Sequence, residues 1–238
     1  VAGYGTAASR LERAGLDGVE VVASHGYLPA QFLNPRVNLR EDDYGGSLEN
    51  RLRFLREAVT AARATTAPGF VVGIRVSVDE MGHDGLTADE VMAALRLLDA
   101  DGAVDYVSVV AGSSATLAGS EHIAPPMSRP AAYTAPLAAL VKTAVSVPVM
   151  VAGRINQPHE AEQVIASGQA DACAMTRAMI CDPELSAKAE YEQISVQLAQ
   201  ALAEISARKE VGVAFAQSCG GEFNKASVNA IIKYKAAR

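Results

Sequence analysis

The feature that most constrains the fold of this chain is a regular alternation of short apolar segments with longer segments of helical periodicity. Five apolar segments predict strands, at residues 19–23, 70–76, 105–111, 147–152 and 170–175. In the stretches between them, apolar residues recur every three or four positions, which indicates amphipathic helices. Strands that alternate with helices form a parallel sheet with right-handed crossovers. The sequence therefore predicts an α/β fold.

Several of the predicted helices have recognisable first turns. Ser47 can cap the helix that follows the first strand. Thr87 and Glu90 have the spacing of a capping box, in which each residue satisfies a backbone N–H of the other. The expected helices are residues 4–14, the stretches after Ser47 and Thr87, the region from Leu137 to Val141, and the stretch after Pro158. Two more are expected near the C-terminus, at residues 186–209 and 224–236.

Two parallel architectures compete, a barrel and an open dinucleotide-binding sheet. No G-x-G-x-x-G turn follows any predicted strand, which argues against the open sheet. Polar residues instead gather where the strands end. In a TIM (β/α)8 barrel the chemistry lies at the carboxyl ends of the strands. The pattern therefore favours the barrel type.

A long polar stretch separates the first predicted strand from its helix. More than twenty residues rich in His, Tyr, Asn, Arg, Asp and Gly lie between Ala23 and Ser47. A loop of that length in a compact domain is usually functional or disordered. Its aromatic residues and the paired Gly45 and Gly46 argue against disorder. We expect a functional loop at the carboxyl end of the strand.

The same stretch carries a resemblance to a known family. The run HGYLPAQFLNPRVNLREDDYGGSLENRLRFLREAV, which begins at His25, resembles the Old Yellow Enzyme family of FMN-dependent ene-reductases, in particular its 2,4-dienoyl-CoA reductase-like branch. Three later segments agree in order: GIRVS at 73–77, VAGRINQP at 151–158 and MTRAMICDPEL at 175–185. The resemblance covers residues 1–188 and implies a TIM barrel.

Within that barrel the five predicted strands would be the fourth to the eighth. The first three strands of the family have no counterpart in this sequence. The expected architecture is therefore a partial TIM (β/α)8 barrel over residues 1–188, which would bind FMN. Residues 189–238 would form a helical tail of unknown role.

The resemblance implies a cofactor site at three strand ends. Arg75 resembles the arginine that faces the pyrimidine edge of the flavin. An arginine in an apolar strand is costly unless it is paired, and the spacing shows no obvious carboxylate partner, so we favour cofactor contact. Gly153 with Arg154, and Thr176 with Arg177, resemble the family's phosphate grip. Glycine lets backbone N–H groups approach a phosphate, and arginine supplies a bidentate cation.

Two residues of the long loop match the family's catalytic positions. Tyr27 resembles the tyrosine that gives a proton to the substrate carbon; a phenol holds its proton at neutral pH and can pass it to a developing carbanion. The alternative is a packed aromatic side chain. His25 matches a position that binds the substrate carbonyl in the family, whereas Val22 replaces a histidine of some members. His25 could donate to that oxygen or could orient the loop.

The implied function is an FMN-dependent oxidoreductase of the ene-reductase type. Hydride from NAD(P)H would pass through FMN to the C=C bond of a small activated alkene or an enoyl thioester. Two alternatives stay open: amine oxidation or demethylation on the same scaffold, and a truncated non-catalytic assembly module. Because three strands lack a counterpart, we also expect self-association into a homo-oligomer or completion by a missing barrel half.

Composition excludes other classes. The chain has 21 basic and 27 acidic residues and a net charge of −6. It therefore lacks the positive electrostatic field that attracts nucleic acid. No apolar run approaches the ~20 residues of a membrane span, and the first residues do not show a basic region followed by an apolar core, so we expect a cytoplasmic protein. Cys173, Cys181 and Cys219 contain no CxxC pair. We expect buried structural thiols, no metal and no iron–sulfur cluster. His122 is expected to be an exposed loop residue.

Overall fold

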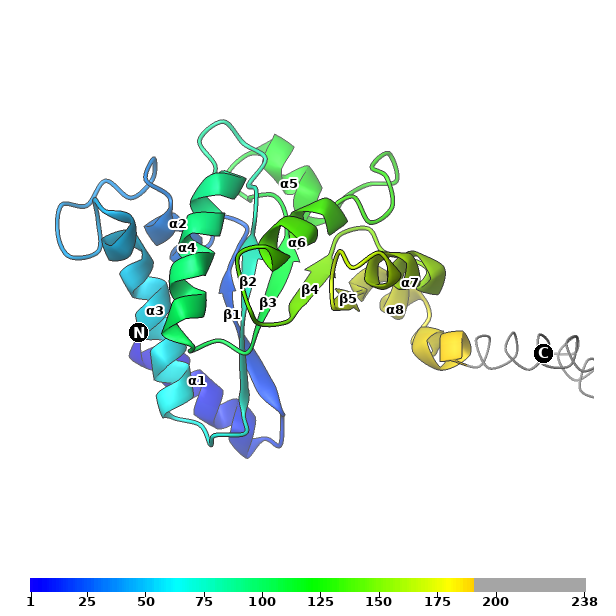
Figure 1. Cartoon of the computed structure of the whole chain (residues 1–238), viewed down its shortest axis with the longest axis horizontal. Helices are drawn as coiled ribbons and strands as arrows, with labels where there is room; N and C mark the ends of the chain where they lie inside the picture. The colour runs from blue at the N-terminus through cyan, green and yellow to red at the C-terminus, as the bar shows by residue number, and fades with distance from the viewer. Residues whose placement is uncertain (191–238) are drawn as a thin grey trace, which may run out of the picture. The chain divides into compact units, whose positions relative to one another are not determined.

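Five strands form one fully parallel sheet in the computed structural model, which describes residues 1–190 (Figure 1). The strands are β1 (Gly18–Ala23), β2 (Val71–Ser77), β3 (Tyr106–Val110), β4 (Val149–Ala152) and β5 (Ala172–Ala174). Each lies within two residues of a predicted strand at both ends. The predicted parallel α/β fold is confirmed.

The strands lie in the order of the chain, β1-β2-β3-β4-β5, and each is hydrogen-bonded to the next. Right-handed crossovers that always advance in one direction place their helices on one face of the sheet. An open dinucleotide-binding sheet instead reverses its strand order in the middle. The observed order therefore agrees with the exclusion of that fold.

The five helices predicted before and between the strands are present, and the two predicted caps have the expected contacts. They are α1 (Ala2–Arg13), α3 (Leu48–Ala64), α4 (Ala88–Asp101), α6 (Ala135–Lys142) and α7 (Pro158–Ala166). The N–H of Asn50 donates to Ser47 Oγ at 3.2 Å. The N–H of Thr87 donates to Glu90 Oε2 at 2.9 Å. In Figure 1, α3 and α4 lie side by side along the sheet.

Three short helices lie where no helix was predicted. They are α2 (Leu28–Leu33), α5 (Leu117–Ile123) and α8 (Thr176–Cys181). Six or seven residues are less than two full turns, so an apolar stripe cannot repeat often enough to be recognised. The long loop after β1 is therefore partly helical, with Pro29 in the first turn of α2.

The two faces of the sheet differ. One face packs against the helices through alternate strand residues that are almost fully buried: Val21, Val72, Ile74, Val76, Val107, Val109, Val149 and Val151. The other face carries Glu20, Arg75 and Tyr106, which are half-buried, and Val22 and Val71, which are 39% and 37% exposed. The apolar core thus lies between sheet and helices, and the opposite face holds polar groups.

The described residues after β5 belong to two units. The compact unit with the sheet ends at Pro183, and a second unit begins at Glu184, of which residues 185–190 are helical. The rest of the helix predicted at 186–209, the helix predicted at 224–236, and Cys219 lie outside the described residues. Within the described part, no helix is long and apolar enough to cross a membrane.

Candidate active site

One cavity at the carboxyl ends of the strands gathers most of the predicted site residues. It has a volume of about 240 Å³. Six of the seven predicted residues line it: His25, Arg75, Gly153, Arg154, Thr176 and Arg177. They come from the end of β1, from β2, from the turn after β4 and from α8. The sheet thus brings together residues that are far apart in the sequence.

The cavity is cationic. Its lining includes Arg75, Arg154 and Arg177, and it contains no aspartate or glutamate. Arginine side chains bind phosphate in a bidentate way, and no carboxylate lines the cavity to repel such a group. This set of side chains therefore suits an anionic ligand.

The turn after β4 requires glycine. Gly153 has φ 154°, and a Cβ atom at this position would overlap the side chain of Thr134. Arg154 follows in the left-handed region with φ 53°, and its carbonyl accepts from the N–H of Ala132 at 3.0 Å. The close approach of Thr134 therefore fixes the turn that presents Arg154 to the cavity.

His25 is held in an uncommon backbone conformation. Its φ is 59°, which is costly for a residue other than glycine. Its N–H donates to Ser77 Oγ at 2.9 Å, and its carbonyl accepts from the N–H and the hydroxyl of Ser114, both at 2.9 Å. The Ser77 hydroxyl in turn donates to the Gly112 carbonyl at 2.7 Å. Residues at the ends of β2 and β3 thus fix the position of His25 at the end of β1.

The environment of His25 favours its neutral form. Burial lowers the pKa of His25 below its ordinary value. The Gly112 carbonyl, 3.4 Å from Nδ1, raises the pKa, and the charge of Arg75 lowers it. The imidazole can therefore act as a neutral hydrogen-bond partner or as a base near neutral pH.

Tyr27 lies beside the cavity but does not line it. Its side chain is 50% exposed. Its ring meets that of His25 edge to face, with centroids 6.2 Å apart. The two residues predicted to be catalytic are therefore neighbours, but only His25 faces the predicted cofactor residues.

Arg75 has a carboxylate partner that the sequence spacing did not reveal. Its Nε lies 2.6 Å from Glu20 Oε1, without the alignment of a hydrogen bond. Tyr106 donates its hydroxyl proton to Glu20 Oε2 at 3.1 Å. Burial and the Glu20 carboxylate raise the pKa of Tyr106 to about 12. Glu20 is on the neighbouring strand, where sequence spacing cannot reveal it. Arg75 nevertheless lines the cavity.

Two expectations about reactive side chains are wrong. His122 is half-buried and lines the cavity, because the loop that carries it folds into α5. Its Nδ1 lies 3.2 Å from the hydroxyl of Tyr133, and burial lowers its pKa. Its position after a strand end was the signal that could have identified it.

Cys181 is exposed and Cys173 is partly buried, so Cys181 is not a core thiol.

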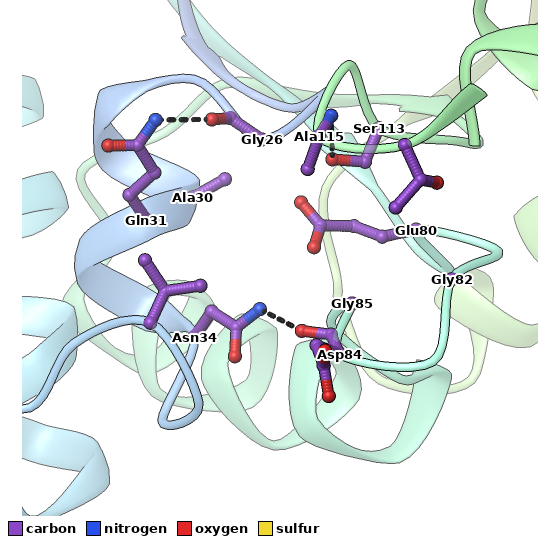
Figure 2. A pocket seen from close by; sticks show the side chains of 12 residues that line it. Gly26, Ala30, Gln31, Asn34, Glu80, Gly82, Asp84, Gly85, Ser113 and Ala115 are labelled. Atoms are coloured by element: carbon purple, nitrogen blue, oxygen red, sulfur yellow. Dashed lines mark hydrogen bonds between the residues drawn. The ribbon is translucent and has the colours of Figure 1, made fainter. Parts of the chain in front are cut away.

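A second cavity, of about 270 Å³, lies beside the turn that carries His25 (Figure 2). Glu80, which the sequence did not single out, is 3% exposed there, and its carboxylate points toward the space between Gly26 and Asn34. Its Oε2 accepts from the N–H of Leu86 at 2.8 Å. Its Oε1 has no hydrogen bond of good geometry. Burial raises the pKa of Glu80, opposed by the N–H groups of Leu86 and Gly26 and by the Asn34 amide.

A cationic cavity at the carboxyl ends of parallel strands is where α/β-barrel enzymes commonly bind a phosphate group. The sequence model of the NADH:flavin oxidoreductase / NADH oxidase family matches residues 1–195. The chain belongs to this family, whose cofactor is FMN and whose reductant is NAD(P)H. The predicted resemblance is confirmed, and the cationic cavity fits a cofactor with a phosphate.

Individual relatives cover most of this chain. It is 43% identical over 190 residues to an N,N-dimethylglycine/sarcosine dehydrogenase of Chromohalobacter salexigens, which is 80% of this chain and 27% of that protein. It is 37% identical over 216 residues to a multifunctional alkene reductase/demethylase of Caballeronia cordobensis, which is 90% of this chain and 30% of that protein.

A solved structure agrees with the sequence matches. A 2-naphthoyl-CoA reductase in complex with 2-naphthoyl-CoA superposes with a TM-score of 0.70 at 32% identity, over 78% of this chain and 28% of that one. The chain spans between 27% and 50% of the length of the curated relatives it matches. It corresponds to a part of those proteins.

Proposed function

We propose that this chain is the flavin-facing part of an FMN-dependent oxidoreductase that reduces an activated carbon–carbon double bond of a small molecule or an enoyl thioester. The observation that carries the proposal is the single cavity, free of carboxylates, that contains six of the seven predicted residues. The five strands would be the fourth to the eighth of a TIM barrel, over residues 1–188. The activity would belong to the cytoplasm, where reduced nicotinamide is available.

Different side chains of the cavity would bind different parts of FMN. Arg154 and Arg177 would hold the phosphate of FMN, together with backbone N–H groups near Gly153 and Thr176. Arg75 would face the pyrimidine edge of the ring. When bound, FMN supplies the hydride chemistry that amino-acid side chains lack. The protein's part is to position the reactants and to exclude competing reactions.

Two side chains would act on the substrate. His25, neutral, protonated at Nε2 and with its backbone fixed by Ser77 and Ser114, would donate a hydrogen bond from Nε2 to the substrate carbonyl oxygen. Tyr27 would hold a proton at its phenol oxygen and give it to the carbon next to that carbonyl. Its edge contact with His25 supports this assignment, because both side chains can then approach one substrate.

The phosphate grip can be tested by comparing two ligands that differ in their phosphate. We expect the protein to bind FMN more tightly than riboflavin, by fluorescence quenching. Arg154→Gln should weaken FMN binding about tenfold, in line with the loss of one charge-assisted hydrogen bond, and leave riboflavin binding unchanged. Arg56→Gln is the matched control, since Arg56 pairs with Asp101 between α3 and α4. Equal affinity for FMN and riboflavin would contradict the proposal.

A second candidate is oxidation or demethylation of a small amine. It is favoured by the 43% identity to the N,N-dimethylglycine/sarcosine dehydrogenase and by the name of the alkene reductase/demethylase. His25 would then act as a base that takes a proton from the substrate ammonium. Rapid mixing distinguishes the two: sarcosine reduces the flavin of an amine oxidase, whereas an enone reoxidises the reduced flavin of an ene-reductase. A protein that binds no flavin would be the non-catalytic assembly module.

A further inference from the structure

Three residues on neighbouring strands form one row across the sheet. Glu20 of β1 is in register with Gly73 of β2, and Gly73 with Tyr106 of β3. A Cβ atom at Gly73 would overlap the ring of Tyr106. The ring therefore crosses β2 above this glycine, and its hydroxyl reaches Glu20 Oε2 at 3.1 Å. The missing side chain at position 73 makes the contact between the outer two strands possible.

Arg75 joins this row from the same face of β2. Its Nε lies 2.6 Å from Glu20 Oε1. Arg75 lines the cavity, whereas Glu20 and Tyr106 do not. The side chains of Glu20 and Arg75 are 19% and 32% exposed, so water screens their charges less than it screens a surface pair. Glu20 is therefore joined to the cavity by its contact with the guanidinium of Arg75.

We propose that Glu20 is a positioning residue that holds the guanidinium of Arg75 at the cavity wall and offsets its charge, and thereby sets the reduction potential of the bound flavin. The inference rests on the proposed flavin site and deepens it. Tyr106 has a supporting role, because its hydrogen bond to the second carboxylate oxygen keeps Glu20 from rotating away from Arg75.

The physical argument is electrostatic. Reduction adds negative charge to the flavin ring, and a nearby guanidinium stabilises that charge. A carboxylate on the far side of the guanidinium cancels part of the effect. Binding of the reduced form relative to the oxidised form is therefore weaker with Glu20 ionised, and the reduction potential is lower. A lower potential makes the flavin a better donor to a substrate.

The test is Glu20→Gln in the flavin-loaded full-length protein, which removes the charge but keeps the shape and an acceptor oxygen. The midpoint potential should rise by about 30 mV, which for a two-electron couple corresponds to a tenfold change in relative affinity. Asp101→Asn is the matched control, because its carboxylate also lies 2.6 Å from an arginine Nε but away from the cavity. An unchanged or lower potential in Glu20→Gln would overturn the inference.

A second variant tests the positioning role without removing the charge. Glu20→Asp shortens the side chain by one methylene, so Arg75 is drawn back from the cavity. FMN affinity should fall about three- to tenfold, and the midpoint potential should fall rather than rise, because the guanidinium then lies farther from the reduced ring. Wild-type FMN affinity in this variant would refute the positioning role. Because the charge is retained, this variant remains informative if Glu20→Gln does not fold.

A measurement without flavin separates this inference from the proposed function. In the flavin-free protein, Glu20→Gln should lower the pKa of Tyr106 from about 12, because the nearby negative charge is gone. Ring-labelled tyrosine followed by NMR gives this value. If Glu20→Gln lowers the pKa of Tyr106 but the protein binds no FMN, the flavin site is refuted and the contact between Glu20 and Tyr106 stands. If the pKa of Tyr106 is unchanged, the contact between Glu20 and Tyr106 is refuted.

Discussion

His25 and Arg154 share the left-handed backbone conformation, with φ 59° and 53°. Among the described residues other than glycine, Met81 and Ala132 also have positive φ. Such residues cost on the order of 1–3 kcal/mol and persist only where the surroundings fix them. The turns of His25 and Arg154 both present a side chain to the same cavity. The strain therefore coincides with the site that the resemblance implied.

The role of Tyr27 can be tested by removing one oxygen atom. Tyr27→Phe should leave flavin reduction by NAD(P)H unchanged and slow the reoxidation by an enone by roughly 10²-fold, the usual scale for a positioned acid. Stopped-flow absorbance measures both half-reactions. Tyr4→Phe is the control, since Tyr4 packs edge to face on Phe54, away from the cavity. Reoxidation at the wild-type rate in Tyr27→Phe would make Tyr27 a structural residue.

The lowered pKa of His25 predicts a pH dependence. Burial is the main cause, so the folded protein keeps this imidazole neutral at and somewhat below pH 6.5. The unfolded chain takes up the proton first as pH falls, which disfavours the folded state below about pH 6.5. We expect the free energy of unfolding, measured by urea denaturation, to be flat from pH 7 to 6.5 and to fall at lower pH. His25→Asn should lack this acid limb, and an NMR titration midpoint above 6.5 would contradict the assignment.

At the scale of the elements, β2 is the strand on which the site depends. It provides Arg75 to the cavity, Ser77 to the turn of His25, and Gly73 to the ring of Tyr106. Val72, Ile74 and Val76, which alternate with these three residues, pack against the helices. Alternate residues of β2 thus point to opposite faces of the sheet: one set packs in the core, and the other set contributes to the site.

Gly73→Ala tests how closely β2 and Tyr106 are packed. The added methyl group overlaps the tyrosine ring and should lower the free energy of unfolding by about 1–3 kcal/mol, the usual cost of overpacking. Urea denaturation measures the change. Gly69→Ala is the control, because no atom lies within 4 Å of its added Cβ. Combining Gly73→Ala with Tyr106→Ala should recover part of the loss; an undiminished loss would contradict the overlap.

The strands were predictable because each is a short apolar run bounded by turns and helices. The caps at Ser47 and Thr87 were predictable because their spacing is local. The short helices α2, α5 and α8 were not, since they are too brief to repeat a pattern. For the site, the family motif located the residues at the strand ends, and the structure brought six of them into one cavity.

The partner of Arg75 shows where sequence reasoning stops. Glu20 and Arg75 are 55 residues apart, and only the register of β1 against β2 makes them neighbours. Register depends on the packing of whole strands, which no local pattern specifies. The half-buried position of His122 has the same origin, because it depends on how α5 folds over the strand ends.

At the scale of the molecule, the described sheet has two edges. β1 and β5 each pair with one neighbour, and Val22 and Val71 are exposed on the face away from the helices. Parallel sheets are normally covered on both faces. We expect the 238-residue chain, expressed alone, to self-associate at micromolar concentration, as measured by sedimentation. A stable monomer with native-like circular dichroism would contradict this expectation.

The residues of the cavity are spread from His25 to Arg177, so no short segment of the chain contains the site. In the unfolded chain these residues are far apart, and FMN has nothing to bind. Binding of FMN therefore also stabilises the fold: at one hundred times the dissociation constant, FMN stabilises the folded state by about 2.7 kcal/mol. The steady-state amount of this protein in a cell would then follow the supply of its vitamin-derived cofactor.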